Sequence, residues 1–246
     1  MRSVLVTGGS RGIGRATALA FARLGDRVAI HHRDSGPLAE ALRDELPGDE
    51  HMVVRADLAD PAAIRNMVEA VAGRYGHIDV LVNNAGLFTS HPITEVSYEE
   101  WQAHWRATLD VNLLGAANVI WCAVRHMGAG GHIVNVSSRG AFRGDPDGVA
   151  YPASKAGLNA LGQSLAIALA PLGISVTAVA PGFVETDMTN EHLKSVRGAE
   201  IRAQSPYNRV ATPEEIAAAI VWLASPQAQW ATGTILDLNG ASYLRT

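Results

Sequence analysis

Short apolar runs alternate along the chain with longer segments of helical period. Runs rich in β-branched residues occupy 3–7, 27–30, 51–54, 79–83, 132–137, 175–180 and 234–238, and most of them lack polar alternation. Continuous apolar strands of this kind are typical of parallel sheets that are covered on both faces. The segments predicted to be helices are 12–24, 61–74, 98–127 and 152–170.

This alternation predicts an α/β protein with a Rossmann fold, in which helices cover both faces of a doubly wound, mostly parallel sheet. The 246 residues contain no Pro/Gly/Ser linker and no internal repeat, so 1–246 are predicted to form a single domain. The segment 156–170 is apolar or small around almost its whole circumference. Such a helix has to be covered on both sides, by its own sheet and by a second surface such as another subunit.

Composition narrows the function classes. Apolar residues make up 48% and charged residues 18%, which is typical of a folded globular protein. The net charge of −4 and the scattered basic residues argue against nucleic acid and anionic membranes as partners. The single cysteine, Cys122, cannot form an intrachain disulfide and indicates a reducing compartment. The start, MRSVLVTGG, does not resemble a signal peptide, and no apolar run approaches the ~20 residues of a membrane span, so we expect a cytoplasmic protein.

A glycine-rich segment, 7 TGGSRGIG 14, follows the first predicted strand and precedes a helix. Gly8, Gly12 and Gly14 let the backbone turn tightly and approach a pyrophosphate, whose charge then meets the helix N-terminus. The spacing G-x-x-x-G-x-G differs from the G-x-G-x-x-G of the standard dinucleotide fingerprint. The segment therefore predicts a nucleotide site, with an ordinary glycine-rich turn as the alternative.

The end of the next strand bears on which dinucleotide is bound. An acid about 20 residues beyond the loop normally binds the ribose 2′-hydroxyl of NAD. Here His32 and Arg33 stand at that position, and Arg11 lies inside the glycine loop. Two guanidinium groups suit a 2′-phosphate, so NADP(H) is predicted as the preferred cofactor. Asp34 is adjacent and keeps NAD(H) open.

The stretch 151 YPASK 155 contains one of only two lysines in the chain, against 18 arginines. At i and i+4 on a predicted helix, Tyr151 and Lys155 share one face. A lysine retained at this place in an arginine-rich chain indicates that its ammonium has a chemical role.

Together, these motifs resemble the short-chain dehydrogenase/reductase family. TGGSRGIG, 83 NNAG 86, LDVNLLG, VNVSS, YPASK and 181 PGFVETDM 188 occur in the order of that family, and the match continues through 212–225 and TGTILDLNGA to cover essentially the whole chain. Within the family, VAPGFVETDMT is most similar to the 3-oxoacyl-carrier-protein reductases. The resemblance implies an NADPH-dependent carbonyl reductase or alcohol dehydrogenase, which transfers hydride between nicotinamide and a ketone or 3-oxoacyl-type substrate.

The resemblance also assigns four catalytic residues. Tyr151 is expected to be the general acid/base, and Lys155 to lower the pKa of its phenol and to hold the nicotinamide ribose. Ser138 is expected to donate a hydrogen bond to the substrate oxygen, in preference to Ser137. Asn112 is expected to hold a water in a proton relay to Lys155.

The expected cofactor contacts cover six segments of the chain. Asn83 and Gly86 are expected beside the cofactor ribose, Asp57 at the adenine, and Thr186 at the nicotinamide amide or the pyrophosphate. The full set is Gly8, Ser10, Arg11, Gly12, Ile13, Gly14, His32, Arg33, Asp57, Leu58, Asn84, Ala85, Gly86, Tyr151, Lys155, Pro181, Gly182, Val184 and Thr186.

Two other functions use the same motifs. One is a dehydrogenase of a sugar, polyol or steroid alcohol, and the other is a nucleotide-sensing regulator without catalysis. No metal is expected, because His31 and His32 lack further ligands at suitable spacing. The family commonly assembles through the helices 98–127 and 152–170, so a homodimer or homotetramer is expected.

A carrier protein is a doubtful partner for this chain. Carrier proteins are acidic, but the segments that supply basic residues in the similar reductases, 126–131 and 168–173, contain only His126. Arg125, Arg139 and Arg143 are partial substitutes, and Tyr207 is expected to narrow the pocket. We therefore expect activity on small free ketones or free thioesters.

Overall fold

The computed structural model describes residues 1–245 and contains one seven-stranded parallel sheet with the order β3-β2-β1-β4-β5-β6-β7. The chain reverses its direction of travel across the sheet between β1 and β4, and such a switch point leaves a crevice at the carboxyl ends of the strands. The strands are β1 (Ser3–Val6), β2 (Arg27–His32), β3 (Met52–Arg55), β4 (Val80–Asn83), β5 (His132–Val136), β6 (Ser175–Pro181) and β7 (Ile235–Leu238).

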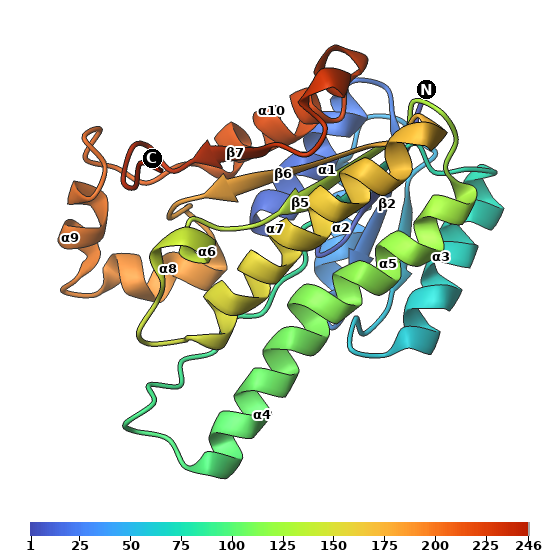
Figure 1. Cartoon of the computed structure of the whole chain (residues 1–246). Helices are drawn as coiled ribbons and strands as arrows, with labels where there is room; N and C mark the ends of the chain where they lie inside the picture. The colour runs from blue at the N-terminus through green and yellow to red at the C-terminus, as the bar shows by residue number, and fades with distance from the viewer. Residues whose placement is uncertain (246) are drawn as a thin grey trace.

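Helices cover both faces of the sheet (Figure 1). One face carries α1 (Gly12–Arg23), α2 (Gly36–Glu45) and α10 (Pro213–Leu223), and the other carries α3 (Pro61–Tyr75), α5 (Ala116–Ala123) and α7 (Ala150–Leu169). Three short helices gather beyond the carboxyl ends of β5 and β6, namely α6 (Gly140–Arg143), α8 (Asp187–Lys194) and α9 (Gly198–Ala203). Further helical segments are α4 (Tyr98–Leu109), η1 (Asp110–Gly115), η2 (Val124–His126), η3 (Ala170–Leu172) and η4 (Pro226–Ala231).

Two hydrophobic cores follow from the alternation of side chains along the strands. Leu5 and Leu81 join the core beneath α3, α5 and α7. Val4 and Val80, one position earlier in each strand, join the core beneath α1, α2 and α10. Because both faces are buried, apolar residues follow one another in these central strands, as in 4–6 of β1 and 80–82 of β4, and this is the origin of the continuous runs in the sequence.

The predicted single-domain, doubly wound α/β fold is confirmed, but the helix expected over 98–127 is not regular. It is divided into α4, the π-helical segment η1, α5 and the short 3₁₀ turn η2. By length and composition alone, Tyr98–His126 would suit a membrane span, since its most apolar 18-residue window has a mean hydropathy of 1.4. Any 18-residue window of this segment includes Asp110 and Asn112, so it is not an uninterrupted apolar run. The α5 part packs on α3 and contributes Val119 and Ile120 to the core.

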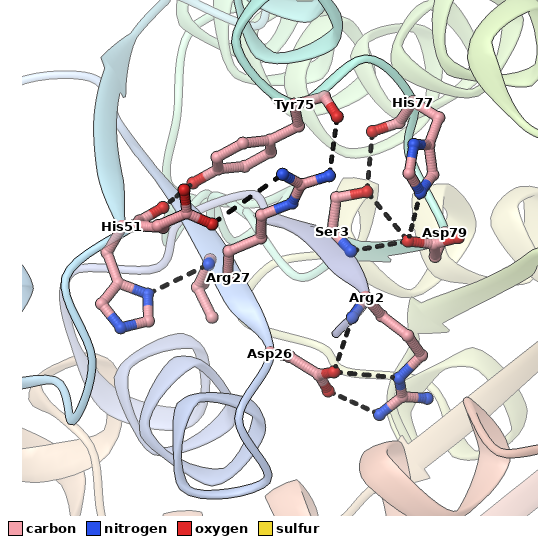
Figure 2. A network of polar contacts seen from close by, with 10 residues as sticks. Arg2, Ser3, Asp26, Arg27, His51, Tyr75, His77 and Asp79 are labelled. Carbon is pink, nitrogen blue, oxygen red and sulfur yellow. Dashed lines mark hydrogen bonds and ion pairs between the residues drawn. The ribbon is translucent and has the colours of Figure 1, made fainter.

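Polar contacts join neighbouring strands at their amino ends, on the side of the sheet opposite the crevice (Figure 2). Arg2 pairs with Asp26, whose Oδ2 lies 2.6 Å from Nη2. The backbone N–H of Ser3 donates to Asp79 Oδ2 at 2.6 Å, and Arg27 Nη2 donates to the carbonyl of Tyr75 at 2.6 Å. These contacts hold the amino ends of β1, β2 and β4 in register. The carboxyl ends of the same strands, which border the crevice, are thereby held side by side.

Candidate active site

The glycine loop connects β1 to α1, and its conformation requires glycine at three positions. Gly8 and Gly12 adopt positive φ values of 61° and 51°, which disfavour any side chain. A Cβ on Gly14 would lie 2.2 Å from the carbonyl oxygen of Gly8, so only glycine allows the helix to begin this close to the loop. Asn84 Nδ2 donates to the carbonyls of Thr7 at 2.9 Å and Gly8 at 3.0 Å. The loop is thus fixed to the end of β4.

Lys155 is buried on α7 and reaches across to β5. Its Nζ donates to the carbonyl of Val136 at 2.8 Å and lies 5.6 Å from the centroid of the Tyr151 ring. Burial lowers the pKa of Lys155 to about 8, because desolvation disfavours the charged ammonium. A Cβ placed on Gly86 would come within 3.5 Å of Nζ. The glycine therefore leaves open the space in front of the ammonium.

Tyr151 and Ser138 lie next to one another at the mouth of the same cleft. Desolvation raises the pKa of the half-buried Tyr151 phenol, and the Ser138 hydroxyl lowers it. Desolvation is the larger influence, so the pKa of Tyr151 is raised. The expectation that Lys155 lowers this pKa is not met in the structure. Ser138 Oγ accepts from the N–H of Gly140 at 2.9 Å, which leaves the hydroxyl proton free to donate.

Asn112 sits in the π-helical segment between α4 and α5, with 1% of its surface exposed. Its Oδ1 accepts from the N–H of Leu87 at 2.7 Å, and its Nδ2 donates to the carbonyl of Leu87 at 2.9 Å. Nδ2 also donates to Ser154 Oγ at 3.1 Å, and Ser154 in turn donates to the carbonyl of Tyr151 at 2.7 Å. Asn112 therefore links the β4–α4 loop to the first turn of α7.

These parts surround one cleft of about 580 Å³ at the carboxyl ends of the strands. Its lining includes every expected cofactor contact except Asn83 and Gly14, together with Ser138. Those lining residues are Gly8, Ser10, Arg11, Gly12, Ile13, His32, Arg33, Asp57, Leu58, Asn84, Ala85, Gly86, Tyr151, Lys155, Pro181, Gly182, Val184 and Thr186. Asn112 and Gly14 lie behind the wall and support it.

Two arginines stand at the end of the cleft formed by β2 and the glycine loop. Arg33 Nε donates to Asp34 Oδ2 at 2.5 Å, while its terminal nitrogens form no hydrogen bond with residues 1–245. Arg11 Nη1 lies 3.7 Å from Asp187 Oδ2, and both side chains are more than half exposed. Each guanidinium thus lies beside a carboxylate and still has N–H groups without a hydrogen-bond partner, which can bind an anion.

Comparison with known proteins agrees with this geometry. A family model described as enoyl-(acyl carrier protein) reductase matches residues 8–240. The 3-oxoacyl-[acyl-carrier-protein] reductase of Staphylococcus aureus is 37% identical over 247 residues, which cover 99% of this chain and 98% of the reductase. L-rhamnose 1-dehydrogenase (NAD(P)(+)) of Azotobacter vinelandii is 38% identical over 252 residues, covering 99% and 97%.

A solved structure extends the likeness to three dimensions. The short-chain dehydrogenase of Burkholderia cenocepacia J2315, crystallised in complex with NADP, has a TM-score of 0.91 at 35% identity, and the likeness covers 98% of this chain and 97% of that one. The chain belongs to the short-chain dehydrogenase/reductase family. Members of the family are NAD(P)-dependent oxidoreductases, and this chain is one of them.

The structure adds cleft residues that the motifs of the family did not suggest. His31 and Ser35 line the cofactor end, where Ser35 Oγ lies 2.7 Å from Ser10 Oγ. Leu87, Phe88 and Met188 line the end near Tyr151. Phe88 packs edge-on against the Tyr151 ring, with centroids 5.6 Å apart. Phe88 and Met188 come from loops and short helices, whose packing cannot be inferred from periodicity.

Three expectations about single residues are wrong. Asn83 belongs to β4, is buried, and donates through Nδ2 to Asn135 Oδ1 at 3.0 Å, so it does not reach the cleft. Tyr207 is 75% exposed and lines a second cavity, so it does not narrow the catalytic cleft. Arg139 is only 9% exposed and lines that same second cavity, so it is not a rim charge.

Proposed function

We propose that this oxidoreductase is an NADPH-dependent carbonyl reductase, or an alcohol dehydrogenase in the reverse direction, with Tyr151 as general acid/base. The observation that carries the proposal is the meeting of three side chains on one cleft wall. Tyr151 and Ser138 lie side by side, and the Lys155 ammonium lies behind the phenol, 5.6 Å from its ring centroid. The glycine loop forms the other end of the same cleft.

The residues present fit a nicotinamide dinucleotide. The loop before α1 offers bare glycine backbone at a helix N-terminus, and the first turn of α1 contains no acidic side chain that would repel a phosphate. His32 Nδ1 is a buried polar atom without a partner in the described structure, and it lies on the same cleft wall. When bound, the dinucleotide supplies or accepts the hydride.

The roles of the protein side chains follow from their contacts. Tyr151 donates its phenolic proton to the carbonyl oxygen of the substrate as negative charge develops there, and Ser138 donates a hydrogen bond to the same oxygen. Lys155, as an ammonium, stabilises the phenolate that forms. Asn112 forms hydrogen bonds with Leu87 and Ser154, and these fix the position of the β4–α4 loop relative to the first turn of α7.

Several features favour NADP(H) over NAD(H). Arg33 and Arg11 both line the adenosine end of the cleft, and the hydroxyl pair of Ser10 and Ser35 adds neutral donors. The Burkholderia neighbour was crystallised with NADP. Asp34 already holds Arg33 through Nε, so a 2′-phosphate would use the two terminal nitrogens of the guanidinium.

The substrate end favours a small apolar ketone or 3-oxoacyl-type compound. Its lining includes Leu87, Phe88, Val111 and Met188, which offer no hydrogen-bonding side chains to a polyhydroxylated molecule. The Azotobacter relative acts on a sugar, so a sugar or polyol alcohol is the second candidate. The apolar lining argues against it.

We also propose a cytoplasmic homodimer or homotetramer. Large apolar side chains are exposed on the helices that the family uses for assembly, including Ile167 at 79%, Leu114 at 54% and Trp121 at 53%. A second copy of the chain that covered these side chains would remove them from water. Size-exclusion chromatography with light scattering gives the number of subunits.

A substrate screen tests the function. Ketones, 3-oxoacyl thioesters, sugars and steroid alcohols are each assayed with NADPH and NADH, or their oxidised forms, by absorbance. We expect NADPH consumption with small ketones or thioesters. Tight NADPH binding without turnover of any compound would instead favour a nucleotide-sensing regulator, and turnover of sugars alone would favour the second candidate.

A further inference from the structure

Arg139 is a buried cation without a carboxylate partner. It directly follows Ser138, but its side chain turns away from the catalytic cleft into a second cavity of about 460 Å³ between α9, α10 and the segment after β7. The residue is 9% exposed. No acidic side chain lies within 4.0 Å of it in the part of the chain that the structure describes. Buried charges are usually paired, because burial without a counter-ion is costly.

The contacts of Arg139 leave one edge of its guanidinium unused. Nη1 donates to Gln204 Oε1 at 2.9 Å and to Ser242 Oγ at 2.6 Å, both of them neutral acceptors. Within residues 1–245, Nε and Nη2 make no hydrogen bond, and neither atom is sealed from solvent. The Nε/Nη2 edge of a guanidinium can bind a carboxylate through two parallel hydrogen bonds.

The charges around the cavity leave Arg139 uncompensated. Arg209 pairs with Glu215 through Nη2 and Oε1 at 2.6 Å, and Arg245 pairs with Asp237 through Nε and Oδ2 at 2.7 Å. The lining therefore contains three arginines and two carboxylates, and the surplus positive charge is that of Arg139. Burial and the nearby Arg143 lower the pKa of Arg139 to about 10, and the more distant charge of Asp145, which raises it, does not offset them.

The remaining walls are mixed in character. Phe183, Ile201, Val210 and Leu238 are apolar, and the guanidinium carbon of Arg139 lies 5.3 Å from the centroid of the Phe183 ring. The cavity volume is within the range of small-molecule sites. Ala241, with φ of 59°, is a wall residue in the left-handed region, where a non-glycine residue is costly unless its surroundings hold it.

We propose that this second cavity binds an organic monocarboxylate, whose carboxylate lies on the Nε/Nη2 edge of Arg139 and whose apolar body packs against Phe183, Ile201 and Val210. The site is separate from the catalytic cleft and does not depend on the proposed function. An inorganic anion would satisfy the charge but would leave the apolar walls unused.

Calorimetric titration with hexanoate, hexanamide and inorganic phosphate tests the proposal on the full chain. We expect hexanoate to bind, and the neutral hexanamide and phosphate to bind at least tenfold more weakly. Arg139→Gln should weaken hexanoate binding about ten- to a hundredfold, as expected for loss of charge-assisted hydrogen bonds. Arg139→Lys keeps the positive charge but lacks the planar guanidinium, so it should give an intermediate affinity. This variant tests the proposal if Arg139→Gln does not fold.

Two control variants separate this cavity from other basic sites. Arg143→Gln removes an exposed neighbour that shares Gln204 but does not line the cavity, and Arg33→Gln removes a cation of the catalytic cleft. Both should bind hexanoate as the unmodified chain does. The proposal is overturned if hexanoate does not bind, if Arg139→Gln binds it equally well, if Arg33→Gln abolishes binding, or if phosphate or hexanamide binds as tightly.

Discussion

The imidazole of His31, at the end of β2, accepts a hydrogen bond from the backbone N–H of Gly8 at 3.0 Å. The other ring nitrogen, Nε2, lies 3.1 Å from the carbonyl oxygen of Ala56 and must carry the proton. The ring therefore has to be neutral to hold the glycine loop between β2 and the end of β3. Burial lowers the pKa of His31 from 6.5 to about 4, in keeping with this role.

We predict that His31 makes stability depend on pH. The unfolded chain takes up the proton near pH 6.5 and the folded chain only near pH 4, so the contribution is complete above about pH 6.5 and is lost as the pH falls toward 4. The difference corresponds to about 3 kcal/mol. Urea unfolding at pH 7 and pH 4.5 should show a smaller pH dependence for His31→Gln than for the unmodified chain. The exposed His192→Gln should leave the dependence unchanged, and equal slopes for all three proteins would refute the prediction.

The two lysines of the chain offer a matched pair of variants. Lys155→Arg places a larger, planar group where Nζ is buried against the Val136 carbonyl, so NADPH affinity and turnover should both fall at least tenfold. Lys194→Arg, on the exposed end of α8, should change neither. Since the pKa of Lys155 is about 8, NADPH affinity of the unmodified chain should decline as the pH rises through that value. A fully active Lys155→Arg would contradict the role given to the ammonium.

Charge reversal at Arg33 tests the cofactor preference. Arg33→Asp removes the terminal nitrogens available to a 2′-phosphate and should weaken NADPH about ten- to a hundredfold while favouring NADH. Arg74→Asp, a charge reversal at the exposed end of α3, is the control. Asp34→Asn should strengthen NADPH, because it releases the Nε of Arg33. Tighter binding of NADH than NADPH by the unmodified chain would mean that Asp34 decides the preference.

Much of the fold could be predicted because its signals are local. Buried parallel strands contain continuous apolar runs, and the glycine loop and the Tyr151–Lys155 spacing are short segments with their own geometry. The helices α2, α8, α9 and α10 are absent from the predicted set. The first three have few apolar positions and receive their stability from packing, whereas α10 is apolar and entered the sequence analysis only as part of the family match over 212–225. The π-helical turn at Asn112 depends on contacts with Leu87 and Ser154, which are distant in sequence.

Residue-level errors have equally specific causes. Asn83 and Asn84 are neighbours in sequence. Asn83 is the last residue of β4, and its side chain is buried against Asn135 of β5, whereas Asn84 follows the strand and lines the cleft. Ser138 and Arg139 differ in the same way, since one lines the catalytic cleft and the next lines the second cavity. A sequence motif gives the position of such residues along the chain but not the direction of each side chain.

A carrier protein should bring little advantage. Of the three arginines expected as partial substitutes, Arg139 is buried and Arg125 lies on the Trp121 ring of α5, 3.1 Å from its centroid, which leaves only the exposed Arg143. We expect similar kcat/KM values for a 3-oxoacyl group on a carrier protein and on a pantetheine thioester, at both low and high salt. A large advantage of the carrier-bound form that disappears as salt rises would point to electrostatic docking and to a role in fatty-acid synthesis.

The most direct measurement is the turnover of Tyr151→Phe on a ketone reduced by the unmodified chain, together with its NADPH affinity. Removing the phenolic hydroxyl should lower kcat by roughly 10²–10⁴, the range for a positioned acid, while NADPH binds almost as before. Tyr207→Phe removes an equivalent hydroxyl from an exposed ring outside the catalytic cleft and should retain full turnover. A Tyr151→Phe variant with turnover within a few-fold of the unmodified chain would contradict the assignment of Tyr151 as the proton donor.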